Sequence, residues 1–179
     1  MQRTIEDHLF RLVYVVRNAA CYEALSQYKD EFEQNWWILI YNNFFDIAIL
    51  EWCKVFGTDS EPTHWKNLIT DHDVFRQGLL SALGTDQASY AAYWETMRSY
   101  RNELLAHRFT KLSVKNYPTL DFALKSSFYY YSILIKMLKR PYPDDLKLYY
   151  DRSFRQAVKF AELSYHSTKA LKESVDIVK

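Results

Sequence analysis

Apolar residues recur at spacings of three and four along most of the chain, the spacing that places side chains on one face of a helix. The first such stretch predicts a helix from about Ile5 to Tyr28. The second predicts a helix from about Phe32 to Phe56 that is apolar on nearly every face, and we expect it in the middle of the bundle. Gly57 is expected to end this helix in the left-handed conformation that glycine takes most easily.

The middle of the chain predicts a less regular section. Residues 58–70 are polar and predict a connection with at most one helical turn, followed by a short helix from about Asp73 to Leu83 that ends at Gly84. Asp86 can cap the next helix, which is expected to end near His107. Four residues of that helix should form a seam that faces the core: Tyr93, Met97, Tyr100 and Leu104.

Two helices complete the predicted fold. Pro118 is placed to open one of them, which continues to about Lys139, where two further prolines end it. The last helix starts near Asp144 and continues into the C-terminal tail. The pattern therefore predicts an all-α bundle of four long helices with one or two accessory helices, and residues 1–179 are expected to form one domain.

The composition supports a folded helical domain and argues against several other classes. Apolar residues make up 49% of the chain and charged residues 25%, which is typical of globular proteins and not of disordered ones. Only 3 glycines and 4 prolines are present, too few for the turns of a β-sandwich or for glycine-rich phosphate loops. Because the net charge is only +1, a basic site for nucleic acid would have to be local.

No segment of the sequence resembles a membrane anchor or a leader. The apolar run from Trp36 to Leu50 is interrupted by Asn42, Asn43 and Asp46 and is shorter than the ~20 apolar residues of a membrane span. We therefore expect a buried helix and no membrane partner. Met1–His8 is charged and lacks the apolar core of a signal peptide, so a cytoplasmic protein is expected.

The two cysteines are expected to be free. Cys21 and Cys53 lie on helices that should be antiparallel neighbours, and this arrangement separates them by ~20 Å along the helix axis. That distance is too long for a disulfide, whose Cα atoms lie ~6 Å apart. Small buried thiols are the simplest interpretation of both residues.

The histidines do not form a recognisable metal site. His8 and His166 stand in charged helical stretches and are interpreted as surface residues. Four residues between the second and third predicted helices could in principle ligate a metal: His64, Asp71, His72 and Asp73. Their spacing fits no known metal motif, so a solvated loop is the preferred interpretation. We expect no metal and no cofactor.

One segment, Arg101-Asn102-Glu103-Leu104-Leu105-Ala106-His107, stands at the predicted end of a core helix. It resembles the motif of the HEPN superfamily, whose helical bundles carry an arginine, often a polar residue after it, a short spacer and a histidine. The layout is similar over about Thr4 to Leu138, with two long leading helices and an aromatic-rich helix after the motif. The chain looks closest to the abortive-infection proteins of bacterial phage defence. Arg3 and His8 also match the spacing of the motif, so the spacing alone is not specific. The resemblance therefore rests on the position of Arg101–His107 at the end of a predicted core helix.

The resemblance implies a metal-independent endoribonuclease that is toxin-like, acts in phage defence and leaves 2′,3′-cyclic phosphate ends. RNA is then the substrate, and an antitoxin protein would be a further partner. The resemblance also implies a two-fold homodimer in which the helix ends near His107 of both chains face a shared cleft. Two alternatives stay open: a non-catalytic HEPN-like module for RNA binding or dimerisation, and a helical scaffold without a nucleic-acid role.

Metal-free cleavage of RNA suits the residue types of this motif. His107 can move a proton to or from the 2′-hydroxyl or the leaving oxygen, because an imidazole titrates near neutral pH. Arg101 can hold the phosphate with its fixed fork of donors, and Asn102 would orient the pair or the phosphate. In an unbroken α-helix Arg101 and His107 lie ~9 Å apart along the axis and ~120° around it. Either the helix ends before His107, or a second subunit completes the site.

Neighbouring polar residues are candidates for the same site. Asp46, with Asn43 on the same face of its helix, could hold Arg101 or the Asn102 amide, although a purely structural hydrogen-bond network is the simpler interpretation. A basic cluster could bind the RNA backbone, although such a run is more often a solvated face. The cluster comprises Arg98, Arg108, Lys111 and Lys115.

Both motif residues also have a structural interpretation without catalysis. Arg101 lies beside Met97 in the helical seam, where an arginine often lays its aliphatic stem on the core. His107 can stabilise the C-terminus of a helix, where positive charge is favourable. The sequence leaves the catalytic and the structural interpretation open.

Overall fold

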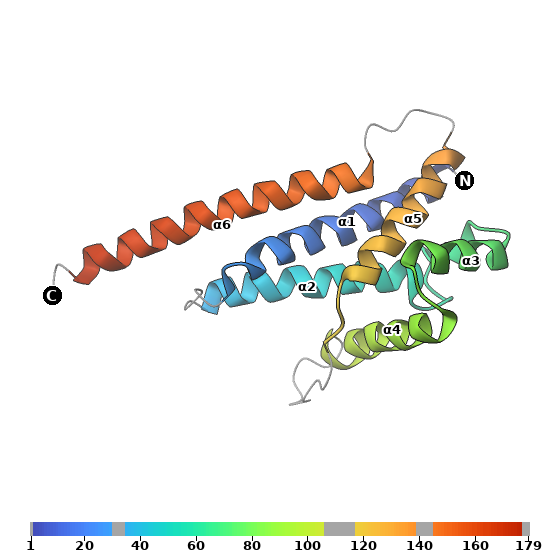
Figure 1. The fold of residues 1–179 in the computed structure, drawn as a ribbon, viewed down its shortest axis with the longest axis horizontal. Coiled ribbons are helices and arrows are strands. Elements are labelled where there is room, and N and C mark those ends of the chain that lie inside the picture. The colour runs from blue at the N-terminus through green and yellow to red at the C-terminus, as the bar shows by residue number, and fades with distance from the viewer. Residues whose placement is uncertain (1, 30–34, 106–116, 139–144, 177–179) are drawn as a thin grey trace.

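The structure is a computed structural model that describes residues 2–29, 35–105, 117–138 and 145–176. Helices are the only regular elements in these ranges, so the predicted all-α fold is confirmed. Four helices are long, and the shorter α3 and α4 are the two accessory helices (Figure 1). The helices are α1 (Gln2–Ser26), α2 (Asn35–Phe56), α3 (His72–Leu83), α4 (Gln87–Tyr100), α5 (Asp121–Met137) and α6 (Leu146–Asp176).

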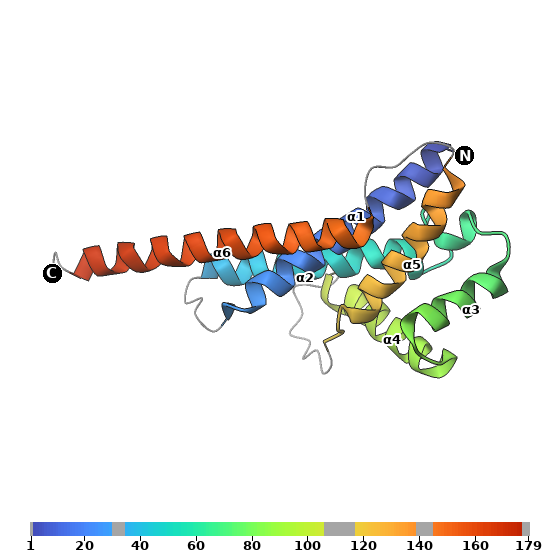
Figure 2. The ribbon, with the colours of Figure 1, turned by 45° about the horizontal axis from the view of Figure 1, so that its top comes forward.

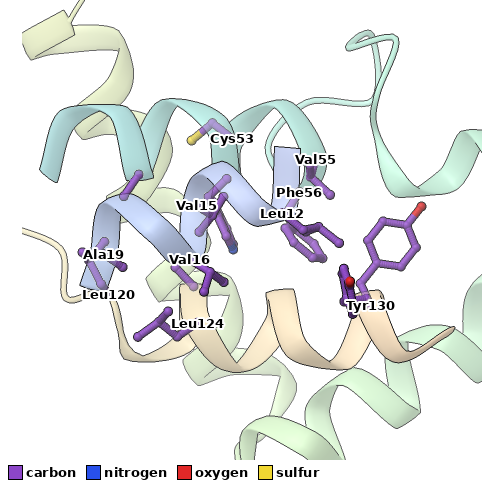
Figure 3. Close-up of a cluster of buried hydrophobic side chains, with 14 of the residues drawn as sticks. Leu12, Val15, Val16, Ala19, Cys53, Val55, Phe56, Leu120, Leu124 and Tyr130 are labelled. Carbon is purple, nitrogen blue, oxygen red and sulfur yellow. The ribbon is translucent and has the colours of Figure 1, made fainter. Parts of the chain in front are cut away.

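Helices α1 and α2 are antiparallel neighbours, as predicted. Arg11 on α1 forms an ion pair with Glu51 on α2 at 2.9 Å, and further along the rings of Tyr22 and Tyr41 stack. Helix α5 covers the other side of α1, where Val16 faces the α5 side chains (Figure 3). The largely apolar side chains buried between these helices make the core, because burial of apolar area is the main favourable term in folding.

Helices α3 and α4 lie at one end of this pair. Helix α4 docks on α2, where the Trp94 indole donates a hydrogen bond of 2.7 Å to the Phe56 carbonyl oxygen. Asp71 and Asp86 cap α3 and α4, each accepting a backbone N–H bond with its carboxylate, as predicted for Asp86. Gly84 ends α3 in the left-handed conformation with φ of 65°.

The structure corrects two expectations about helix ends. Helix α2 ends at Phe56 as predicted, but the role expected of the glycine after it is wrong. Gly57 does not take a positive φ; a Cβ there would lie 2.4 Å from the Cys53 carbonyl oxygen, so the position needs glycine for space. Pro118 does not open α5, which begins at Asp121. The Thr119 carbonyl oxygen instead accepts a hydrogen bond of 2.9 Å from the Tyr93 hydroxyl, and this tertiary contact takes the place of the first helical bond.

His8 is fully buried, which corrects its interpretation as a surface histidine. Its Nδ1 and the hydroxyl of Tyr130 on α5 share a hydrogen bond of 2.9 Å. Its Nε2 has no hydrogen-bond partner among the described residues. His166 is exposed, as expected.

Helix α2 is less enclosed than the sequence predicts. One face carries exposed apolar side chains, with Trp36 58%, Leu39 53% and Ile47 37% exposed. The interacting neighbours α1, α4 and α5 lie on its other faces. The prediction that α2 lies in the middle of the bundle is therefore only partly correct.

Helix α6 extends past the rest of the molecule. It follows α1 up to the end of that helix, where Tyr28 donates a hydrogen bond to Glu162 and its ring contacts Tyr165. From there α6 continues alone to Asp176, as both views show (Figures 1 and 2). None of the helices in the described ranges is long and apolar enough to cross a membrane.

Both cysteines are free thiols, as predicted. Cys53 is buried at the contact of α2 with α4, where its thiol lies 3.7 Å from the Met97 carbonyl oxygen. Burial raises the pKa of Cys53 to about 12, so this thiol stays protonated. Cys21 is half-buried and thus less enclosed than expected.

Candidate active site

The last turn of α4 is fixed firmly on α2. Met97 and Tyr100 are buried there, which confirms these two positions of the predicted seam. The Tyr100 hydroxyl donates a hydrogen bond of 2.7 Å to the buried carboxylate of Asp46, and its ring meets Phe45 edge-on. A buried carboxylate needs such a partner, because an unpaired one would be costly. The backbone that leads into Arg101 is therefore held in place.

The α-helix ends at Tyr100 and a π-helix follows it from Arg101 to Leu105. This wider turn holds the first five residues of the Arg101–His107 segment. π-Turns are rare and often occur at functional sites. Which of the two ways completes the site, a helix that ends before His107 or a second subunit, stays a prediction. His107 itself lies outside the described residues.

Arg101 extends from this turn toward the segment that follows α2. Its Nη1 lies 3.4 Å from the Thr58 hydroxyl and 3.8 Å from a carboxylate oxygen of Glu61, and its Nε donates to the Asn102 side-chain oxygen at 3.0 Å. The side chain is 19% exposed. These three contacts orient the guanidinium, and its Nη2 has no partner among the described residues.

Thr58 and Glu61 were not predicted as part of this site. They follow α2 in sequence but lie about forty residues before Arg101 along the chain. Only the docking of α4 on α2 brings them to the guanidinium. A single sequence contains no local signal for such a contact.

Asp46 and Asn43 occupy different settings on α2. Asp46 is buried and bound to Tyr100, the residue immediately before Arg101, whereas Asn43 is half-buried on the more open face. The carboxylate described next to the Arg101 guanidinium is that of Glu61. A direct bond from Asp46 to Arg101 or Asn102 stays a prediction.

Arg98 is engaged in local contacts. Its guanidinium lies over the Trp94 ring at 4.3 Å from the centroid, and its Nη1 meets Glu95 at 3.4 Å. Cation–π contact of this kind fixes the side chain against the helix. Its Nε is buried without a hydrogen-bond partner in the described part of the chain. The other predicted RNA-binding residues lie outside the described residues: Arg108, Lys111 and Lys115.

A cavity of about 280 Å³ lies on the other side of the segment that holds Arg101. Gly57 and Asp59 line it, and these residues flank Thr58 in the chain. Apolar and aromatic side chains of α3 and α4 form much of its wall, whereas its polar lining includes two cations. The wall includes Leu79, Leu80, Tyr90 and Trp94, and the cations are Lys66 and Arg76.

His64, which also lines this cavity, is buried, so the predicted solvated loop is wrong at this position. The neighbouring Trp65 stacks on Phe75 at 4.3 Å and anchors the segment in the core. His64 accepts a bond from the Lys66 backbone N–H, and its Nε2 lies 3.5 Å from Asp59. Burial lowers the pKa of His64 to about 4. No group of three potential metal ligands occurs among residues 2–29, 35–105, 117–138 and 145–176.

Comparisons with models of protein families, with curated proteins and with solved structures found no match to this chain. What the site can do therefore has to be argued from its residues. An arginine that is oriented at the end of a core helix can bind an oxyanion such as a phosphate. His107 follows Arg101 by six residues in the sequence.

Proposed function

We propose that this protein is a metal-independent endoribonuclease of the HEPN type, with Arg101 and His107 as its catalytic pair. The observation that carries the proposal is the arrangement of Arg101: Asn102 and Thr58 orient its guanidinium, and its Nη2 has no partner among the described residues. An arginine that only laid its stem on the core would not need these polar contacts. The π-turn that presents Arg101 supports a functional rather than a purely structural role.

In the proposed reaction the 2′-oxygen of a ribose attacks the adjacent phosphorus. The 2′-hydroxyl loses its proton, the new O–P bond forms, and the bond to the 5′-oxygen breaks as that oxygen gains a proton. His107 performs one of these proton transfers. Arg101 stabilises the charge that gathers on the non-bridging oxygens, and Asn102 keeps the guanidinium in position. The products are a 2′,3′-cyclic phosphate and a free 5′-hydroxyl.

The surroundings of Arg101 offer binding sites for the rest of the RNA. The basic residues Arg108, Lys111 and Lys115 follow the motif in sequence and can contact the backbone. The cavity beyond Thr58 is of a size that admits a base, and its aromatic wall suits a flat ring. The resemblance to abortive-infection proteins adds the proposed setting: a cytoplasmic toxin in phage defence that acts as a homodimer and is restrained by an antitoxin.

Cleavage assays with substituted proteins test the catalytic pair. Arg101→Ala and His107→Ala should each lower RNA cleavage at least ~100-fold, because each removes one phosphate- or proton-handling group. Helicity and thermal unfolding should stay as in the wild type. A chelator should have no effect on the rate, and the product ends should be 2′,3′-cyclic phosphates. Undiminished cleavage by His107→Ala would contradict the mechanism.

Helix α6 provides a matched control. Arg155→Ala and His166→Ala change an exposed arginine and an exposed histidine far from the site and should leave cleavage unchanged. Arg3 and His8, although they match the motif spacing, are a poor control because His8 is buried and bonded to Tyr130. Loss of activity in both control variants would show that the assay responds to charge rather than to the site.

A non-catalytic RNA-binding module is the second candidate. The ion pair of Arg101 with Glu61 favours it, since that carboxylate partly neutralises the guanidinium. If this candidate is correct, the wild type binds RNA without cleaving it, and Arg101→Ala weakens the binding. A panel of single-stranded and structured RNAs, scored for both binding and cleavage, separates the two candidates.

A further inference from the structure

The cavity beside the Gly57–Asp59 segment is large enough for a small molecule. Its volume of about 280 Å³ is many times the ~10–15 Å³ that one water molecule needs. Protein interiors are otherwise close-packed, with few voids larger than a water molecule. Three of the residues that line it are exposed, Asp59 after α2, Arg76 on α3 and Ala91 on α4. The cavity is therefore a cleft that a ligand can enter from the solvent.

The aromatic residues of the cavity wall are held in place by contacts of their own. Trp65 stacks on Phe75 with ring centroids 4.3 Å apart. The Trp94 indole is fixed by its bond to the Phe56 carbonyl oxygen, and the Arg98 guanidinium lies over its ring. A preformed aromatic wall favours a flat ring as ligand, because few side chains have to be ordered when it binds.

Tyr90 adds a polar group to this wall. It lines the cavity, and its hydroxyl has no hydrogen-bond partner among the described residues. Burial raises the pKa of Tyr90, so the hydroxyl stays protonated. Buried hydroxyls are rarely left unpaired, and a polar atom of a ligand ring can pair with this one.

Two cations of the cavity favour an anionic group on the ligand. Lys66 and Arg76 both line it. Each has a carboxylate partner, Asp59 for Lys66 and Asp73 for Arg76. A guanidinium has five N–H donors and an ammonium has three, so both cations can bind a further oxygen. His64 adds no charge to the lining at neutral pH, because burial lowers its pKa to about 4.

The balance of charge favours a single negative charge on the ligand. The carboxylates of Asp59 and Asp73 stand next to the two cations, so the local net charge is close to zero. Both carboxylates would repel a dianionic phosphate more strongly than a group with one charge. A carboxylate group also matches the planar fork of donors on Arg76. These contacts therefore point to a carboxylate rather than a phosphate.

We infer that this cavity is the binding site of a small aromatic carboxylate. The ring lies against the aromatic wall, and the carboxylate binds Arg76 and Lys66. The volume of the cavity lies at the lower end for ligand sites, which suits a mono- or bicyclic acid better than a whole nucleotide. Only residues around the cavity carry this inference, so it is independent of the ribonuclease proposal.

NMR titration of the isotope-labelled full chain tests the site. Indole-3-carboxylate should bind with a Kd of ~1 mM or lower, as expected for a ligand of about a dozen heavy atoms. The indole N–H signals of Trp65 and Trp94 should shift, and that of Trp36, at the other end of α2, should not. Indole-3-carboxamide keeps the shape without the charge and should bind at least ~10-fold more weakly. Equal affinity for acid and amide, or no saturable shift, overturns the inference.

Substitutions at exposed positions assign the binding to the cavity. Arg76→Gln should weaken binding of indole-3-carboxylate at least ~10-fold, whereas Arg155→Gln on α6 should not change it. Ala91→Phe should fill the cavity and abolish the shifts, whereas Ala92→Phe, at the next residue of α4, should leave them. All four positions are exposed, so the fold should survive, which circular dichroism can verify. Binding that is insensitive to both Arg76→Gln and Ala91→Phe overturns the assignment.

Adenosine monophosphate tests the alternative that the cavity takes a nucleotide of the RNA. It should bind more weakly than indole-3-carboxylate, because its phosphate carries the additional charge. Tighter binding of the monophosphate that is lost in Ala91→Phe overturns the carboxylate and supports a base site. None of these titrations measures cleavage, so their failure and a failure of the ribonuclease proposal are separate results.

Discussion

A single buried hydrogen bond joins α1 to α5 through His8 and Tyr130. Burial raises the pKa of Tyr130, so its hydroxyl stays protonated. Burial also lowers the pKa of His8 to about 4; Asp7 opposes this shift and His64 adds to it. The sequence contains a signal for the burial, because Ile5, His8 and Leu12 share the heptad spacing of the α1 core positions. The charged residues near His8 in the sequence favoured the incorrect prediction of a surface position.

This histidine should make the protein sensitive to mild acid. Its pKa is lower in the folded chain than the ~6.5 of the unfolded one, so the unfolded state takes up more protons between these values. The stabilisation is complete above pH ~6.5 and is lost as the pH falls toward 4. The loss from His8 approaches roughly 3 kcal/mol at ~1.4 kcal/mol for each pKa unit. Urea unfolding at several pH values between 7 and 4 measures it.

A paired substitution isolates the contribution of His8. His8→Leu alone leaves the Tyr130 hydroxyl buried without its hydrogen-bond partner and should cost about 1–3 kcal/mol at neutral pH. Adding Tyr130→Phe removes that hydroxyl and should recover much of the loss. The double variant should also lose less stability on acidification than the wild type, whereas His166→Gln should titrate like the wild type. An unchanged acid response in the double variant contradicts the assignment to His8.

At the scale of elements, helix ends decide where Arg101 points. The segment after α2 must turn tightly enough at Gly57 for Thr58 and Glu61 to meet Arg101, which the π-turn after α4 presents. The end of α2 was predicted correctly from the sequence. The role of Gly57 was not, because the position needs glycine for space and not for a left-handed conformation. The π-turn could not be predicted, because its residues are ordinary helix formers and the wider turn depends on tertiary contacts.

Two glycine substitutions separate a steric from a conformational requirement. Gly57→Ala should destabilise the fold by roughly 1–3 kcal/mol, because its Cβ would overlap the Cys53 carbonyl oxygen. It should also lower RNA cleavage by displacing Thr58. Gly84→Ala, with φ of 65° and open space around the Cβ, should cost only about 1 kcal/mol and leave cleavage intact. Chemical denaturation and the cleavage assay, applied to both variants, measure these effects.

At the scale of the molecule, the all-α class and the order of helices could be predicted from the sequence, because each helix has a clear periodicity and several have caps or breakers. The exposed face of α2 could not be predicted, because the sequence of a helix that is apolar on all sides does not indicate which face lacks a neighbour. The contacts of Arg101 with Thr58 and Glu61 likewise depend on which helices dock. Periodicity in the sequence indicates that a helix has a buried face, but it does not indicate which other helices cover that face.

The free end of α6 should contribute little to stability. A chain that stops after His166 keeps the contacts at Tyr165 and Glu162, so its thermal midpoint should change by no more than about 2 °C. A chain that stops after Arg155 also loses the buried Ala161 and should unfold clearly earlier. Differential scanning calorimetry of the two truncated proteins measures the difference. A large loss in the longer protein would show that the end of α6 has a partner.

The same overhang changes how the protein moves through a solvent. The ten residues of α6 after His166 extend about 15 Å at ~1.5 Å per residue, nearly the ~16 Å radius of gyration of a compact chain of this length. Such a rod adds friction without adding mass, so a monomer of 21.5 kDa should elute from a gel-filtration column ahead of globular standards of equal mass. Elution volume alone would therefore be mistaken for dimerisation, and light scattering has to supply the mass.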